Sequence, residues 1–277
     1  MLYVWGIARC YGGEVLLRIE DHDQSRSRTE YEIALLDDLE WMGFEADVAS
    51  IHSFRRAHTK HPFRQSDNAD RYARALRTLD DEGLVYACDC TRRTINGLNP
   101  QATGEEARYP GTCRGRQVRP TSTVARRVRL AGGEVSIDDL RLGEVVQVPA
   151  QQCGDLLARD GRGHWTYQFA VTVDDMAQHI DVVIRGEDLL PSTGRQFHLA
   201  ALLGRAKPPI VLHHPLVVHP SGAKLSKAAR DTSLRERRAA GAMPEQLIGE
   251  AAYLAGLTRT RTSLPAVDVA RLFLPSP

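Results

Sequence analysis

The segment that most constrains the fold of this chain is an apolar run that passes directly into charged residues. Val15–Ile19 is short and mostly apolar, and Glu20, Asp21, His22 and Asp23 follow it without a turn residue. Strands that end in this way in open α/β sheets bring their polar side chains to the carboxyl edge of the sheet, where ligands bind. The segment therefore predicts a strand that carries part of a binding site.

Two helix patterns and another strand pattern follow this segment. The sequence Ser27–Glu30 has the form of a capping box, and the helix that it begins is expected to end at Gly43. A second helix is expected from about Asp67 to Glu82, and residues 84–87 are expected to form a strand. This order of strand, helix, helix and strand favours an α/β fold.

The remainder of the chain continues the alternation of strand and helix patterns. Two dense apolar runs, 165–175 and 179–190, end in charge like the opening run. Residues 91–123 are rich in Pro, Gly, Arg and Thr, which is typical of an irregular insertion that needs another source of order. Further expected elements are a helix over 2–11, short antiparallel strands within 124–150, a helix over 193–203, a buried strand over 213–218 and a helix over 244–257.

The bulk composition excludes several classes of protein. The 277 residues are 42% hydrophobic and 26% charged, which is ordinary for a globular chain, and the net charge of +1 gives no strong general attraction to nucleic acid. The sequence has no apolar run of about 18 residues and no pattern of a secretory leader. Its five cysteines, an odd number, favour a reducing compartment. We therefore expect a cytoplasmic protein without membrane contact.

Three of the cysteines have the spacing of a metal site. Cys88 and Cys90 are two positions apart, and Cys113 follows after the irregular insertion. Thiolates at such spacing are typical zinc ligands, and a bound zinc ion would stabilise the insertion. The fourth ligand stays open among Tyr109, Cys153 and a carboxylate. Three unrelated buried cysteines are the alternative.

A polar loop near the C-terminus is a candidate phosphate-binding segment. Lys224 and Lys227 are three positions apart, and Gly222 and the hydroxyl groups of Ser221 and Ser226 flank them. Two ammonium groups in this arrangement can neutralise the charge of a polyphosphate in a transition state.

Four motifs together resemble the catalytic domain of class I glutamyl-tRNA synthetases. They are Leu-Arg-Ile-Glu-Asp-x-Asp at 17–23, Tyr-Gln-x-Ala-x-x-x-Asp-Asp at 167–175, Val-x-Arg-Gly-x-Asp-Leu-Leu at 183–190 and Lys-Leu-Ser-Lys at 224–227. The resemblance covers about residues 2–250 in the same order. It implies an α/β, Rossmann-type catalytic domain with a parallel sheet, a zinc-containing insertion and a helical C-terminal segment.

Two features are similar to a branch of that family, the glutamyl-queuosine tRNA(Asp) synthetases. The chain ends about fifty residues after the lysine loop, and Val171 stands where the full-length enzymes usually carry Asn. Resemblance to this branch implies that the chain activates glutamate with ATP, accompanied by Mg²⁺, and transfers it to the queuosine base of tRNA(Asp). It also implies a monomer.

The resemblance also implies roles for individual residues. Glu20, Tyr167 and Arg185 would bind glutamate, and Lys227, helped by Lys224, would act on the ATP phosphates. One structural Zn²⁺ would be bound by the set Cys88, Cys90, Tyr109 and Cys113.

The implied domain limits are 1–87 with 151–235 for the catalytic domain, 88–150 for the zinc-binding, acceptor-type insertion and 236–277 for the helical segment. The family begins with a strand that carries Arg-Phe-Ala-Pro-Ser and with a His-x-Gly-His-type ATP signature, and neither occurs in this sequence. We therefore expect an N-terminally truncated catalytic domain whose sheet lacks one strand and whose ATP site is incomplete.

Two alternatives remain open at this point. One is a catalytically impaired homologue that binds tRNA or glutamate, and the other is a shortened enzyme that charges tRNA(Glu). Val171 and the short C-terminal region argue against the second. In the first, RNA would be bound by scattered arginines, namely Arg92, Arg93, Arg114, Arg116, Arg126 and Arg127.

Overall fold

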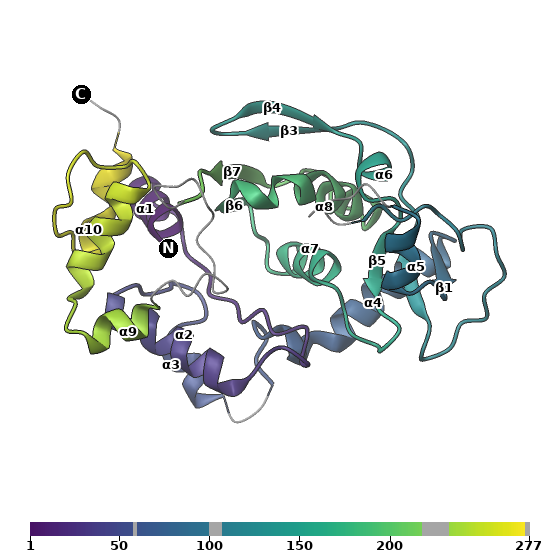
Figure 1. Cartoon of the computed structure of the whole chain (residues 1–277), viewed down its shortest axis with the longest axis horizontal. Helices are drawn as coiled ribbons and strands as arrows, with labels where there is room; N and C mark the ends of the chain where they lie inside the picture. The colour runs from purple at the N-terminus through teal and green to yellow at the C-terminus, as the bar shows by residue number, and fades with distance from the viewer. Residues whose placement is uncertain (58–59, 100–106, 218–232, 275–277) are drawn as a thin grey trace.

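The computed structural model describes residues 1–57, 60–99, 107–217 and 233–274, and its elements are shown in Figure 1. The first half contains α1 (Leu2–Tyr11), α2 (Thr29–Met42), α3 (Ile51–Arg56), η1 (Gln65–Asn68), α4 (Ala69–Asp81), β1 (Val85–Cys88), α5 (Arg92–Gly97), β2 (Ala125–Val128) and β3 (Val135–Asp139). The second half contains β4 (Gly143–Gln147), α6 (Pro149–Gln152), β5 (Leu156–Arg159), α7 (Tyr167–Ala177), β6 (Val182–Gly186), η2 (Glu187–Leu189), α8 (Leu190–Leu202), β7 (Ile210–His214), α9 (Leu234–Ala239), α10 (Pro244–Leu254) and η4 (Ala266–Phe273).

A four-stranded sheet in the order β4-β3-β7-β6 is the part of the fold that positions the candidate site. Strand β7 pairs in parallel with β6 and with β3, while β4 pairs antiparallel with β3. The register of β6 and β7 places Arg185 opposite His213 at their carboxyl ends. The parallel pairings confirm the predicted α/β class with a parallel sheet.

A second sheet, in the order β1-β2-β5, is antiparallel throughout. The short antiparallel strands expected within 124–150 are therefore present, but they are divided between two sheets. Strand β2 joins β1, whereas β3 and β4 extend the parallel sheet. These pairings cross the expected domain limits at residues 88 and 150, and the limits themselves stay a prediction.

The opening segment differs from the expected strand. It is extended, with Val15, Leu17 and Ile19 buried, but it forms only isolated parallel bridges, Leu16 with Val48 and Ile19 with Arg64. The buried residues occur at every second position, as in a strand, because the side chains of an extended chain alternate between its two faces. A regular ladder does not form because each bridge has a different partner segment.

Two local predictions were wrong for identifiable reasons. Helix α2 begins at Thr29 after Arg28, which makes no side-chain capping bond, so Ser27 lies one position too early to cap it. The run 165–175 lies mostly in helix α7 rather than in a strand, because an apolar run alone does not distinguish a buried helix from a buried strand. The predicted helix end at Gly43 is confirmed, since Gly43 has a left-handed backbone with φ of 76°.

The C-terminal helices pack against the beginning of the chain. Trp5 of α1, Leu247 and Ile248 of α10 and Val269 of η4 share one apolar cluster with residues of α2 and α3. These helices gather at one end of the elongated molecule, and β1, β5 and α5 lie at the other end (Figure 1). Within the described residues, no helix is both long enough and apolar enough to cross a membrane.

Candidate functional site

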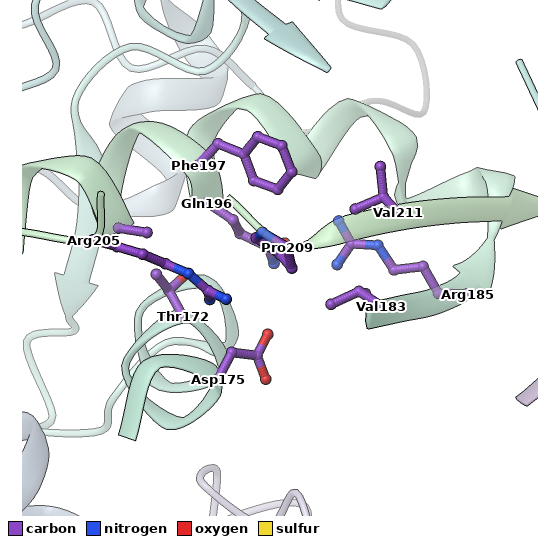
Figure 2. A pocket seen from close by; sticks show the side chains of 10 residues that line it. Thr172, Asp175, Val183, Arg185, Gln196, Phe197, Arg205, Pro209 and Val211 are labelled. Carbon is purple, nitrogen blue, oxygen red and sulfur yellow. The ribbon is translucent and has the colours of Figure 1, made fainter. Parts of the chain in front are cut away.

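Arg185 is the central cation of the candidate site, and it projects from the end of β6. Its Nε donates a hydrogen bond to His213 Nε2 at 3.3 Å, and its Nη2 donates one to Thr193 Oγ1 at 2.9 Å. Burial lowers the pKa of Arg185, although the nearby Tyr167 and Asp175 oppose this shift. Figure 2 shows the side chain beside Val183 and Val211, with Asp175 of α7 across the pocket.

Behind Arg185 lies a buried polar network that the sequence reasoning missed. His213 Nδ1 lies 2.6 Å from Asp139 Oδ2, and both side chains have no exposed surface. Burial lowers the pKa of His213. Burial alone would raise the pKa of Asp139, but hydrogen bonds from His213 and from the backbone of Leu142 and Arg141 lower it. The available signal was that Asp139 ends a strand pattern and that His213 directly follows the apolar run Ile210–Leu212, although the strand was expected over 213–218 and β7 instead spans Ile210–His214.

Glu20 and Tyr167 approach Arg185 from two other elements. Glu20 ends the extended opening segment with 39% of its side chain exposed, and Tyr167 begins helix α7. Partial withdrawal from water raises the pKa of Glu20, which Asp175 raises further and Arg18 opposes. Burial raises the pKa of Tyr167, and the charge of Glu20 adds to that shift. The structure thus brings the three predicted glutamate-binding residues into one electrostatic neighbourhood.

Arg18 and the two adjacent acids of helix α7 complete this neighbourhood. Arg18 Nη2 donates to Asp175 Oδ1 at 2.6 Å, and its Nε lies 4.0 Å from Glu20 Oε1. Within the described residues, Arg18 Nε and Nη1 are buried without a hydrogen-bond partner. Burial raises the pKa of Asp175, and Arg18 lowers it. Asp174, in contrast, is fully buried and faces Gln65 and helix α4.

A second candidate site is formed by the cysteines at and after the end of β1. The Sγ atoms of Cys88, Cys90 and Cys113 all lie within 4.8 Å of one another, and Cys90 and Cys113 are 3.5 Å apart. Tyr109 Oη lies 3.4 Å from Cys88 Sγ and accepts the backbone N–H of Cys113 at 2.8 Å. In a tetrahedral site with Zn–S of about 2.3 Å, neighbouring sulfur atoms are about 3.8 Å apart. The three cysteines therefore fit a metal ion, with Tyr109 beside them, and Cys153 makes its contacts with Pro149 and Gly154 instead.

A cleft of about 910 Å³ extends from this cysteine group to Tyr167. Arg92 and Arg162 line it, as do Asp160 and His164. Most of the other arginines considered for RNA binding already have partners within the chain: Arg114 pairs with Asp155, Arg116 with Asp89, Arg126 with Asp80, and Arg127, which also lines the cleft, donates to the carbonyl of Asp155. The two predicted phosphate-binding residues, Lys224 and Lys227, lie outside the described residues.

A comparison with the descriptions of known protein families decides which family the chain belongs to. The description "tRNA synthetases class I (E and Q), catalytic domain" matches residues 1–263. The chain belongs to this family. The resemblance predicted from the four motifs is thereby confirmed, and so is the class I synthetase fold.

Individual members of the class I family support the same relationship. The chain is 37% identical over 266 residues to a Glutamyl-Q tRNA(Asp) synthetase of Nitratidesulfovibrio vulgaris. The aligned region covers 92% of this chain and 80% of that protein. It is 36% identical to the Glutamyl-Q tRNA(Asp) synthetase of Symbiobacterium thermophilum, over 98% of this chain and 87% of that protein. A Glutamate--tRNA ligase 2 of Halorhodospira halophila is 36% identical, but this chain spans only 51% of its length.

Solved structures of the class I family show the same fold. The glutamate-tRNA synthetase of Elizabethkingia anophelis superposes with a TM-score of 0.77 at 22% identity, covering 98% of this chain and 61% of that chain. The chain thus spans about three fifths of the solved synthetase and half of the longer ligase, but most of the Glutamyl-Q relatives.

Proposed function

We propose that this protein is an ATP-dependent ligase that activates glutamate and transfers it to the queuosine base of tRNA(Asp). The observation that carries the proposal is the convergence of Arg185, Glu20 and Tyr167 in a class I synthetase chain that spans 80–87% of two Glutamyl-Q tRNA(Asp) synthetases. Since its substrates, ATP and tRNA, are cytoplasmic, we place the protein in the cytoplasm.

The charges of the candidate site suit glutamate as the amino acid. A guanidinium group presents paired donors to a carboxylate, so Arg185 holds the carboxylate of glutamate that does not react. Glu20 attracts the α-ammonium group, and the phenol of Tyr167 orients the substrate. The second carboxylate then attacks the α-phosphate of ATP and releases pyrophosphate, and a hydroxyl group of queuosine displaces AMP from the adenylate.

This chemistry depends on positioning and on neutralisation of phosphate charge rather than on a protein nucleophile. Lys227, assisted by Lys224, steadies the ATP phosphates, which arrive with Mg²⁺. Cys88, Cys90, Tyr109 and Cys113 hold one zinc ion, which orders the segment around β1 and shapes one wall of the 910 Å³ cleft.

Pyrophosphate exchange that requires both glutamate and ATP tests the activation step. Transfer is tested with labelled glutamate and three RNAs: tRNA(Asp) containing queuosine, tRNA(Asp) with guanine at that position, and tRNA(Glu). The proposal expects label only on the first RNA. Label on tRNA(Glu), or no glutamate-dependent exchange, would overturn it.

A matched pair of variants links the activity to the site. Arg185→Gln removes both hydrogen bonds to a substrate carboxylate and should raise the KM for glutamate about 100-fold, with little change in the KM for ATP. Arg55→Gln removes an arginine of α3 that pairs with Asp37 and Glu40 on the surface, and it should leave both constants unchanged. Equal behaviour of the two variants would remove Arg185 from the substrate site.

A further inference from the structure

The hydrogen bonds of Arg185 occupy one particular edge of its guanidinium group. The group has five N–H donors, one on Nε and two on each Nη. Nε is bound by His213 and one donor of Nη2 by Thr193, so the side edge of the plane is already used. His213 and Thr193 leave the end edge, formed by Nη1 and the second donor of Nη2, to a ligand and to the phenol of Tyr167, which also interacts with the guanidinium group. A two-donor edge of this kind matches one carboxylate.

His213, which binds Nε on that side edge, is held in one protonation state by its own surroundings. Asp139 Oδ2 accepts the backbone N–H of His213 as well as approaching Nδ1 at 2.6 Å, and Asp139 Oδ1 accepts two more backbone N–H groups, those of Arg141 and Leu142. A carboxylate that accepts so many donors stays ionised, so the proton of the imidazole resides on Nδ1. His213 Nε2 then carries the lone pair that Arg185 Nε–H requires.

Burial and the charges of Arg185 and Arg141 favour the neutral form of His213, whereas the charge of Asp139 opposes it. Asp139 is contributed by β3, Arg141 by the turn that follows it, and Arg185 by β6, while helix α8 contributes the uncharged Thr193. An imidazolium would direct a second N–H against Arg185 Nε–H and would add a cation beside two arginines. Thr193 Oγ1 lies 3.0 Å from His213 Nε2 and also accepts from Arg185 Nη2, so helix α8 holds Arg185 and His213 in place together with β6 and β7.

We propose that Asp139, His213 and Thr193 are positioning residues that lock the Arg185 guanidinium so that only its Nη1/Nη2 edge receives the carboxylate of the amino acid. This inference deepens the proposed function and rests on it, since Arg185 must be the carboxylate-binding residue. Thr193 and His213 are fully buried and do not touch the substrate, so they act through Arg185 alone.

Thr193 offers the cleanest variants because its side chain is buried and small. Thr193→Val keeps the shape but removes the acceptor of Arg185 Nη2, and it should raise the KM for glutamate about tenfold in pyrophosphate exchange, with the KM for ATP unchanged. Thr193→Ser restores the hydroxyl group and should return the glutamate KM to within about twofold of wild type. An unchanged glutamate KM in Thr193→Val, or an equal rise in both constants, would overturn the inference.

A spectroscopic measurement tests the inference without using activity. In ¹⁵N NMR spectra of the full chain, the imidazole of His213, assigned by its loss in His213→Gln, should show a protonated Nδ1 and an unprotonated Nε2 at pH 7. A protonated Nε2 would overturn the locked arrangement whatever the enzyme does. Absence of glutamate-dependent exchange in wild type, with the expected tautomer present, would instead overturn the proposed function.

Discussion

Asp174 should be a structural acid whose loss destabilises the fold rather than the substrate site. Its side chain has no exposed surface and accepts hydrogen bonds from Gln65 Nε2 at 3.1 Å, Arg71 Nη1 at 2.6 Å and Tyr72 Oη at 2.7 Å. These donors belong to η1 and α4, whereas Asp174 belongs to α7. Asp174→Ala would therefore leave three donors from another part of the core without an acceptor.

The cost follows from the burial of each donor. The side chains of Tyr72 and Gln65 are almost completely buried. Leaving either polar group without a partner therefore lowers the free energy of unfolding by about 1–3 kcal/mol. The side chain of Arg71 is 22% exposed and can turn to water, so its share is smaller. The total is about 3–5 kcal/mol, which for a chain of this size corresponds to a fall in Tm of roughly 10 °C.

A double-mutant cycle gives this prediction a sharper form. Tyr72→Phe removes one donor and should cost about 1 kcal/mol. The double variant should be less destabilised than the sum of the single variants, because the orphaned hydroxyl group is then absent. Thermal and urea unfolding followed by circular dichroism measure these differences, with Asp70→Ala, an exposed acid of the same helix α4, as the control. Strict additivity, or an Asp174→Ala stability close to that of Asp70→Ala, would refute the reasoning.

Three further predictions concern other parts of the molecule. Cys113→Ser should lower the bound zinc from one equivalent to near zero and reduce Tm, as measured by metal analysis and thermal unfolding; an unchanged zinc content would contradict the metal site. Gly249→Ala should destabilise α10 by about 1–3 kcal/mol because the added Cβ would meet the carbonyl oxygen of Thr262, whereas Gly97→Ala meets open space and should be nearly neutral in the same unfolding assay. Stability should fall as the pH drops below about 6.5, because the unfolded chain then binds protons that the folded chain refuses. The responsible groups, whose pKa values burial lowers, are His61, His198 and His213. Unfolding free energies at pH 7.5 and 5.5 check the sign, and His198→Gln should flatten the profile.

Local sequence determined the features whose physical cause lies within a few residues. Glycines end helices because they adopt left-handed backbone conformations, which is why the ends of α1 at Gly12 and of α2 at Gly43 were predictable. The cysteine spacing predicted a group that the fold brings together, and the motifs selected Glu20, Tyr167 and Arg185 before any geometry was known.

Tertiary structure decided the features whose partners are distant in the chain. The apolar run 165–175 had no local signal that separates a helix from a strand, and packing against α4 and α8 made it α7. Asp174 and Asp175 are sequence neighbours, yet Asp174 is hydrogen-bonded by buried donors of η1 and α4, whereas Asp175 is hydrogen-bonded by Arg18, because a helix turns by about 100° per residue. Asp139 and His213 are separated by 74 positions and meet only because β3 and β7 are neighbours in one sheet. Sequence pattern can therefore name the residues that bind a substrate, whereas the strand order of the sheet determines which residues hold them in place.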